Sequence, residues 1–185
     1  TGASGEGGAA LKFDLEVMGC EIVSVDQAKY EVKVTQGGDL EGRLIHVASK
    51  QQMLGKRYAG NDPRRLAHAF ADDVVKMLRG ADGIAQTRIA YKGEMRQGYS
   101  EIYVADYDGY NAVPLTADNS LVAAPAWVKA RNAVFYTSYK LGTPKIFSHN
   151  LSTGERKVAA GYPGLNTSVA ISPDGSKIAM VLSKN

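Results

Sequence analysis

Alternating apolar and charged residues mark the first patterned stretch of the chain. Its apolar positions are Leu11, Phe13, Leu15 and Val17. A period of two buries one face of a β-strand and exposes the other, so residues 11–17 are predicted to form a strand. Residues 1–9 contain four glycines and no large apolar side chain, and we expect them to fray.

Two further short runs have the composition of strands. The first covers residues 30–34 and the second covers residues 43–47. Two glycines at 37–38 separate them, and such pairs are typical of turns. Together with residues 11–17, these runs predict a three-stranded antiparallel meander.

The period changes to that of a helix after residue 62. Asp62 is suited to cap the N-terminus, and Pro63 is suited to the first helical position, where an N–H has no intrahelical partner. Apolar residues recur every three or four positions from Leu66 to Leu78, and Gly80 follows as a C-terminal stop. We predict an amphipathic helix that packs on the preceding sheet.

An internal repeat of 44 residues dominates the rest of the chain. Residues 101–140 align with residues 145–184, so that Val-Phe-Tyr at 134–136 falls over Ile-Ala-Met at 178–180. Repeats of about 40–45 residues built from short strands are typical of β-propeller blades. A closed propeller has about four to eight blades, and this stretch has room for about two.

These patterns predict an α/β N-terminal domain, a small sheet plus a helix, followed by all-β propeller blades. We place the α/β domain at residues 1–86 and an incomplete propeller of about two blades at residues 87–185. The sequence Ser172-Pro173-Asp174-Gly175 predicts a tight turn between two blade strands, because proline suits the second position of such a turn.

Composition narrows the function classes. The chain has 22 Lys and Arg against 19 Asp and Glu, a net charge of +3, so the electrostatic signature of a nucleic-acid binder is lacking. Its single cysteine, Cys20, excludes an intramolecular disulfide and a multi-cysteine metal site. No apolar run approaches the roughly 18 residues that a membrane span needs.

The catalytic motifs of common enzymes are missing from the sequence. It contains no His-Glu-x-x-His, Gly-x-Ser-x-Gly or P-loop element. The three histidines, His46, His68 and His149, are scattered, and His68 is interpreted as a surface pair with Asp72 one helical turn away. We predict no catalytic site, no metal site and no cofactor.

Two other motifs allow a structural and a functional interpretation. The spacing of Asp106, Asp108 and Asn111 resembles the front of a calcium loop but lacks its terminal glutamate, so a hairpin turn is favoured. A set of aromatic residues suggests either a sugar-stacking platform or, as we favour, packing between blades. That set comprises Trp127, Phe135, Tyr136, Tyr139 and Phe147.

Several stretches together carry a family resemblance. They are Thr-Arg-Ile-Ala-Tyr at 87–91, Ala-Asp-Tyr-Asp-Gly-Tyr-Asn at 105–111, Pro-Ala-Trp at 125–127, Tyr-Pro-Gly-Leu-Asn at 162–166, Ile-Ser-Pro-Asp-Gly at 171–175, and Arg-Tyr-Ala-Gly at 57–60 ahead of the helix to Gly80. In this order they resemble the TolB family, the periplasmic propeller proteins of the Tol-Pal system. The resemblance extends over roughly residues 10–185.

The resemblance implies a non-catalytic, protein-binding role in the envelope. In this family a six-bladed propeller binds the peptidoglycan-associated lipoprotein Pal, and the N-terminal part contacts the inner-membrane protein TolA. It implies a periplasmic protein that is peripheral to the membrane through its partners only and supports outer-membrane integrity and cell division. It also implies that this sequence lacks four blades and the front of the α/β domain.

Loops that lead into the innermost blade strands lie at the mouth of a propeller channel. On this basis we predict partner contacts in residues 162–167 and in the loop that starts at Ser183, with Leu165 as an apolar anchor and Asn166 as a hydrogen-bonding group. Two alternatives are that these residues only turn the chain and that the protein is a truncated propeller without a partner of its own. A second hypothesis is the propeller lid of a serine peptidase of the prolyl oligopeptidase type, whose catalytic domain would lie beyond this chain. A downstream Gly-x-Ser-x-Gly element would favour that hypothesis.

Overall fold

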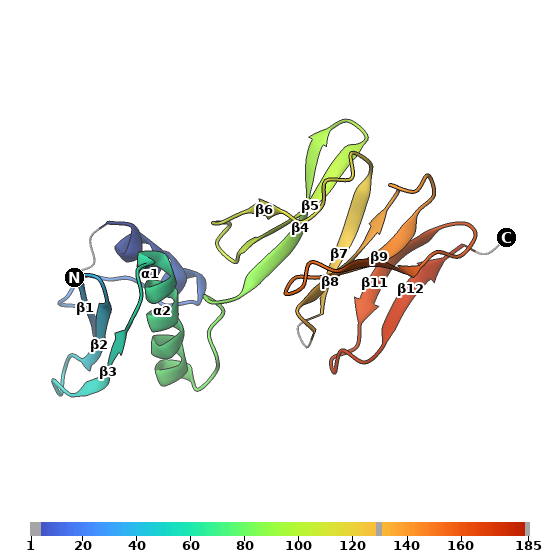
Figure 1. Ribbon diagram of the computed structural model, residues 1–185. Coiled ribbons are helices and arrows are strands. Elements are labelled where there is room, and N and C mark those ends of the chain that lie inside the picture. The colour runs from blue at the N-terminus through green and yellow to red at the C-terminus, as the bar shows by residue number, and fades with distance from the viewer. Residues whose placement is uncertain (1–4, 129–130, 184–185) are drawn as a thin grey trace. The chain divides into compact units, whose positions relative to one another are not determined.

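The computed structural model describes residues 5–128 and 131–183. The chain divides into two compact units, Thr1–Thr87 and Arg88–Asn185, and each is described here by itself (Figure 1).

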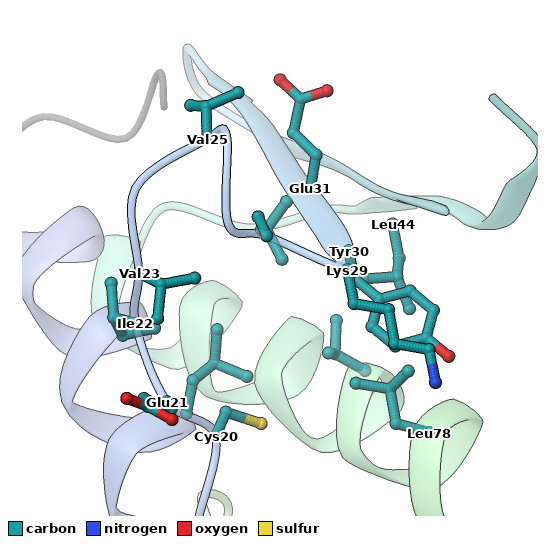
Figure 2. A pocket seen from close by; sticks show the side chains of 14 residues that line it. Cys20, Glu21, Ile22, Val23, Val25, Lys29, Tyr30, Glu31, Leu44 and Leu78 are labelled. Atoms are coloured by element: carbon teal, nitrogen blue, oxygen red, sulfur yellow. The ribbon is translucent and has the colours of Figure 1, made fainter. Parts of the chain in front are cut away.

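Unit 1 combines two helices with a three-stranded antiparallel sheet of order β1-β2-β3. Its elements are α1 (Gly5–Val17), β1 (Tyr30–Gln36), β2 (Leu40–His46), β3 (Gln52–Tyr58) and α2 (Pro63–Arg79). In the register, Tyr30 lies opposite His46 and Leu40 lies opposite Tyr58. A cavity opens between α2, β1 and the segment that joins α1 to β1 (Figure 2).

The predicted strand over residues 11–17 is wrong, because these residues belong to helix α1. The buried positions of α1 repeat at three and four residues: Gly7, Ala10, Leu11, Asp14 and Leu15. Leu11 and Leu15 satisfy both periods, whereas Phe13 and Val17 are 44% and 50% exposed. Alternation was therefore coincidental, and the helical stripe that packs on α2 decides the structure.

The expected fraying of the start is also wrong for residues 5–9, which form the first turns of α1; residues 1–4 lie outside the described residues. Gly7 has a packing role here. A Cβ atom at this position would lie 2.6 Å from Oε1 of Gln36 and 3.1 Å from the carbonyl oxygen of Pro63. The glycine therefore allows α1 to approach the sheet and the start of α2 closely.

The three-stranded meander is present, but its membership differs from the prediction. Residues 30–34 and 43–47 fall in or beside β1 and β2, and the third strand is β3 rather than residues 11–17. Four of the seven residues of β3 are polar or glycine, and the same four are exposed. An edge strand of this kind buries too little apolar surface to leave a hydrophobic signal.

Helix α2 agrees with its prediction at both ends. Oδ1 of Asp62 accepts hydrogen bonds from the backbone N–H groups of Arg64 (3.0 Å) and Arg65 (3.1 Å). Gly80 has a left-handed backbone, with φ of 71°, and donates its N–H to the carbonyl of Lys76. Phe70, in the middle of the helix, is fully buried, and its ring occupies the space that a Cβ atom on Gly42 would need.

Unit 2 consists of consecutive antiparallel sheets (Figure 1). The first contains β4 (Arg88–Arg96), β5 (Tyr99–Asp106) and β6 (Val113–Pro114). The second has the order β7-β8-β9-β10 and is built from β7 (Val122–Val128), β8 (Ala133–Ser138), β9 (Lys145–Asn150) and β10 (Arg156–Ala160). The third pairs β11 (Asn166–Ile171) with β12 (Ile178–Leu182).

The middle sheet of unit 2 is buried on both faces. Val134 and Tyr136 join one apolar cluster with Ile102 of the first sheet. Phe135, on the opposite face of the same strand, joins a second cluster against which Val169 and other residues of the third sheet pack. A sheet between two neighbours is the arrangement of a propeller blade. The predicted packing role of Phe135, Tyr136 and Phe147 is confirmed by their burial in these clusters.

Candidate functional site

Of the predicted contact residues, Leu165 and Asn166 lie where β10 connects to β11, and Ser183 directly follows β12. Asn166 begins β11 and is fully buried. Its Oδ1 accepts a hydrogen bond from the N–H of Tyr162 (3.0 Å), and its Nδ2 lies 2.8 Å from the carbonyl oxygen of Tyr162 and 3.1 Å from that of Pro144. The amide of Asn166 therefore holds the loop 161–165 closed and ties it to the loop before β9.

Leu165 and Ser183 are joined by two hydrogen bonds. The N–H of Leu165 donates to Oγ of Ser183 (2.9 Å), and the N–H of Ser183 donates to the carbonyl of Leu165 (3.0 Å). Gly164 precedes this pair with φ of +88°, and a Cβ atom there would lie 2.1 Å from the carbonyl oxygen of Ser183. The close approach of the two segments therefore requires glycine at position 164.

The structure thus brings Leu165, Asn166 and Ser183 together, although only part of this group is accessible. Ser183 is exposed and Leu165 is half-buried, whereas the side chain of Asn166 is directed into the loop. Tyr162 of the same loop is 62% exposed. Tyr162 is the first residue of the predicted contact range 162–167. Contact with a partner remains a prediction for all of them.

The equivalent connection one repeat earlier, between β6 and β7, is held by an ion pair between Asp118 and Arg156. Asp118 has a fully buried side chain, and its two oxygens accept hydrogen bonds from Nη1 and Nη2 of Arg156, both at 2.5 Å. Oγ of Ser138 donates to the same carboxylate at 2.6 Å. Burial by itself raises the pKa of Asp118, but the bonds from Arg156 and Ser138 outweigh it and hold the pKa below its ordinary value.

Aromatic rings surround the guanidinium of Arg156. Its carbon lies 4.3 Å from the ring centroid of Phe147 and 5.2 Å from that of Tyr136. Burial raises the pKa of the Tyr136 hydroxyl. Burial, followed by the charge of Arg156, lowers the pKa of His149, whose Nδ1 lies 3.4 Å from Oη of Tyr136. The lowered pKa favours the neutral form of His149. The cluster joins side chains from the three neighbouring strands β8, β9 and β10.

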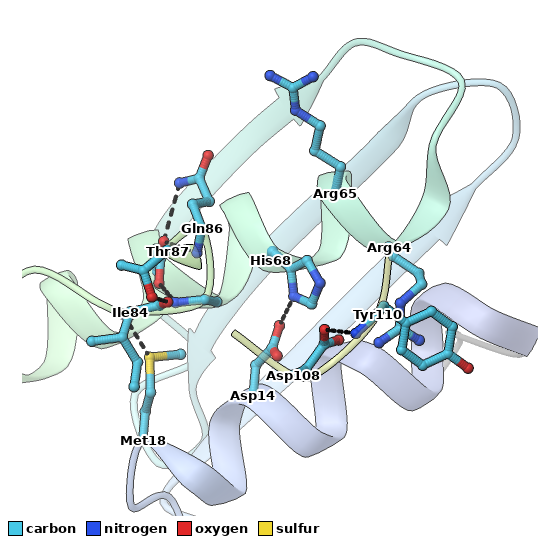
Figure 3. A network of polar contacts seen from close by, with 12 residues as sticks. Asp14, Met18, Arg64, Arg65, His68, Ile84, Gln86, Thr87, Asp108 and Tyr110 are labelled. Carbon is cyan, nitrogen blue, oxygen red and sulfur yellow. Dashed lines mark hydrogen bonds and ion pairs between the residues drawn. The ribbon is translucent and has the colours of Figure 1, made fainter. Parts of the chain in front are cut away.

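The interpretation of His68 and Asp72 as a surface pair is wrong. Nδ1 of His68 lies 2.7 Å from Oδ2 of Asp14, and both side chains are buried between α1 and α2 (Figure 3). Asp72 instead accepts the N–H groups of Ala85 (2.8 Å) and Gln86 (3.2 Å). The predicted strand over residues 11–17 puts the charged Asp14 on its exposed face, so the sequence pattern does not indicate its pairing with α2.

The motif at residues 106–111 forms the predicted hairpin turn. Oδ1 of Asp108 accepts the N–H of Tyr110 (3.1 Å), and Nδ2 of Asn111 donates to Oδ2 of Asp106 (2.6 Å). Within residues 5–128 and 131–183, no group of three or more His, Cys, Asp or Glu side chains is placed to hold a metal ion. Within the same ranges, no helix has the length and apolar character that crossing a membrane requires.

Comparison with known proteins relates the chain to one family. A family model described as PD40, the TolB beta propeller domain, matches residues 75–185, which is more than half of the chain. A relative from Alcanivorax borkumensis, named Tol-Pal system protein TolB, is 29% identical over 177 residues, covering 93% of this chain and 40% of that protein. A relative of the same name from Desulfosudis oleivorans is 33% identical over 147 residues, covering 78% of this chain and 33% of that protein.

A solved structure supports the architecture. The crystal structure of TolB from Acinetobacter baumannii matches with a TM-score of 0.80 and 23% identity, over 96% of this chain and 52% of that one. This match confirms the predicted fold class, an α/β N-terminal part followed by incomplete propeller blades. The chain spans less than half the length of the two curated relatives. With more than half of its residues matched by the family model, the chain belongs to the TolB beta-propeller family.

Proposed function

We propose that this chain is the N-terminal α/β domain and first blades of a non-catalytic, periplasmic component of the Tol-Pal system. In this proposal its blades bind the peptidoglycan-associated lipoprotein Pal and its N-terminal part contacts TolA, so that it supports outer-membrane integrity and cell division. The observation that carries the proposal is the family match over residues 75–185, together with the name shared by two relatives.

The geometry of the loop 161–165 suits a binding role. It is short, held from inside by Asn166 and pinned to Ser183 by two hydrogen bonds. A preorganised loop loses little conformational entropy when a partner binds. Tyr162 is exposed on this rigid base, and tyrosine is among the residue types that contribute most to protein interfaces. We therefore place the Pal contact on Tyr162, Leu165 and Ser183, with Asn166 acting through the shape of the loop.

The test is calorimetric titration of the chain with the soluble domain of Pal. Tyr162→Ala is expected to weaken binding at least about tenfold, as expected for a central aromatic contact. Tyr110→Ala is a matched control, because Tyr110 is 50% exposed and lies in the β5–β6 connection. In the repeat alignment, the β5–β6 connection corresponds to the one after the third strand of a blade, whereas Tyr162 follows the fourth strand. Consecutive antiparallel strands end on opposite sides of the sheet, so Tyr110 and Tyr162 are on connections at opposite ends of the strands.

Equal affinity of the wild type and Tyr162→Ala for Pal, with the fold retained, would show that the loop 161–165 does not contact Pal. No binding of Pal by the wild-type chain, together with no binding of the periplasmic domain of TolA, would contradict the proposed role of the chain. The two curated relatives carry the name of a Tol-Pal protein, and this gives the peptidase-lid hypothesis no support.

A further inference from the structure

Four connections lie at the same end of unit 2, because every second connection along consecutive antiparallel strands falls at one end of them. They are residues 97–98 between β4 and β5, 115–121 between β6 and β7, 139–144 between β8 and β9, and 161–165 between β10 and β11. The last of these is the loop to which the partner contact is assigned above.

Hydrogen bonds join the four connections in space. The N–H of Ser100, at the start of β5, donates to the carbonyl of Ser120 (3.0 Å). The N–H of Tyr139 donates to the carbonyl of Leu121 (3.0 Å). The side-chain amide of Asn166 ties the loop 161–165 to the connection before β9. The four connections therefore form one continuous surface, the loop surface of unit 2.

Apolar side chains are exposed on three of the four connections. Leu121 is 38% exposed, Leu141 is 53% exposed and Tyr162 is 62% exposed. Leu141 lies in a tight turn that is closed by a hydrogen bond from the N–H of Gly142 to the carbonyl of Tyr139 (2.9 Å). Exposed apolar groups on a fixed backbone are typical of protein-contact sites.

The carboxylates at this end of unit 2 are buried. In the four connections, all of which the structure describes, the only acidic residue is Asp118, and its side chain is fully buried. Glu101 of β5 is also buried, and its Oε1 accepts a hydrogen bond from the N–H of Asn119 (2.8 Å). A partner therefore meets neither negative charge directly.

Lys140 adds a positive charge to the loop surface. Its side chain is 48% exposed, and its Nζ lies 3.5 Å from Oδ1 of Asp118. Arg156 and Ser138 already donate hydrogen bonds to that carboxylate. Because Arg156 balances the charge of Asp118, the ammonium group of Lys140 is available to a second carboxylate on a partner.

Two further cations border the loop surface. Arg96 ends β4 and is exposed, and its guanidinium carbon lies 4.0 Å from the ring centroid of Tyr99. Lys145 begins β9 and is half-buried. Glu94, two positions before Arg96, is paired with Lys92 at 2.8 Å. The exposed charge of the loop surface and its border is therefore net positive.

We propose that the loop surface binds an acidic segment of a protein partner, whose carboxylate pairs with Lys140 and whose apolar side chain packs on Leu141. This inference rests on the proposed function and adds the charge that the partner carries. Complementary charge discriminates between partners and speeds their association. An anionic membrane is disfavoured, because surfaces that bind it electrostatically carry about four to eight cations.

The test compares Leu141→Lys with Leu141→Glu in the 185-residue chain. Both variants remove the leucine and differ only in the sign of the charge at one exposed position, so both should fold, and circular dichroism checks this. In calorimetric titration with the soluble domain of Pal at low salt, Leu141→Glu is expected to bind at least about tenfold more weakly than Leu141→Lys. The ratio should fall towards one at about 1 M salt, where the Debye length is about 3 Å.

Val113→Lys and Val113→Glu are the matched controls. Val113 is 52% exposed and begins β6, next to the connection at the opposite end of the strands. The two control variants should bind Pal equally. Lys140→Gln is expected to weaken binding about threefold, as for an exposed ion pair, whereas Lys177→Gln, in the turn between β11 and β12, should have no effect.

The outcomes separate this inference from the proposed function. If the wild type binds Pal and the two Leu141 variants bind it equally, the inference is wrong and the proposed function stands. If the wild type does not bind Pal, the proposed function is contradicted, and two capped peptides test the inference: acetyl-Glu-Leu-Leu-Glu-amide and acetyl-Lys-Leu-Leu-Lys-amide.

The acidic peptide is expected to shift the amide NMR signals of residues 139–144, and the basic peptide is not. Equal shifts with both peptides would overturn the inference. Vesicles of phosphatidylglycerol and of phosphatidylcholine test the membrane alternative. Binding of the phosphatidylglycerol vesicles that is weaker for Leu141→Glu than for Leu141→Lys, without binding of Pal or of the acidic peptide, would assign the loop surface to an anionic membrane instead.

Discussion

Ala124 and Ser168 lie 44 residues apart and share a left-handed backbone, with φ of 53° and 54°. Each falls where the pairing register shifts in the first strand of its sheet, between Ala123 and Ala126 in β7 and between Thr167 and Ala170 in β11. The repeat seen in the sequence is therefore also a repeat of backbone conformation, including a bulge that neither residue type favours.

Glycine at either bulge should stabilise unit 2. A left-handed conformation costs a non-glycine residue about 1–2 kcal/mol, and glycine avoids this cost. Glycine also loses more conformational freedom on folding, which cancels part of the gain. We expect Ala124→Gly to raise the free energy of unfolding by about 0.5–1 kcal/mol. Urea unfolding monitored by the single tryptophan, Trp127, reports on this unit. Ala126→Gly, outside the left-handed position, should be destabilising, and the same sign for both variants would contradict the prediction.

Removal of one partner from the Asp118–Arg156 pair should destabilise unit 2 strongly. Loss of one member leaves a buried charge uncompensated, at a cost of about 3 kcal/mol. Asp118→Asn is therefore expected to lower the urea midpoint at pH 7, measured by Trp127 fluorescence. Glu155→Gln is the control, since the Glu155 side chain is 63% exposed and should be neutral.

The same pair predicts a pH dependence with a defined sign. The pKa of Asp118 is lowered in the folded state, so its contribution to stability is complete above the unfolded pKa of about 3.9. It is lost as the pH falls through the lower, folded-state pKa. The difference in stability between wild type and Asp118→Asn should therefore be constant from pH 7 to about 5 and shrink below about pH 4. A difference that persists undiminished at acid pH would argue against the ion pair.

The buried contact between Asp14 and His68 should stabilise the pairing of α1 with α2. Asp14→Ala removes one partner of a buried hydrogen bond and is expected to cost about 2 kcal/mol in unit 1. Circular dichroism at 222 nm during urea unfolding measures it. Glu16→Ala, on the same helix, removes only an exposed pair with Lys12 at 3.8 Å and should cost less than about 0.5 kcal/mol. A double-mutant cycle with His68→Ala isolates the coupling, and additive effects would contradict direct pairing.

Gly164→Ala should open the candidate partner-binding loop. Alanine there needs a left-handed backbone and brings its Cβ to 2.1 Å from the carbonyl of Ser183. We expect faster amide exchange at Leu165 and Ser183 and a loss of at least about 1–2 kcal/mol. Gly154→Ala is a matched control, with φ of +72° and open space around the added Cβ. If both variants behave alike, the backbone conformation alone matters and the close approach does not.

The features that sequence reasoning identified correctly depend on neighbours in the chain. Asp62, Pro63 and Gly80 act on the ends of their own helix, and the turn at Ser172–Gly175 is closed by the side chain of Asp174, which hydrogen-bonds Ser172 and Ser176. The repeat period of 44 residues is visible in the sequence because each blade forms the same strands and turns from similar residues.

Tertiary structure decided the features that depend on distant partners. Leu11 and Leu15 fit a strand and a helix equally well, and only the packing of α1 on α2 selects the helix, buries Asp14 and places it against His68. The cavity beside β1 likewise arises from residues of four elements. By itself the sequence determined the fold class, helix α2 and the blade repeat, since these follow from local periodicity and turn chemistry. The buried pairs and the bulges required the folded chain, because long-range contacts leave no periodic trace in the residues that make them.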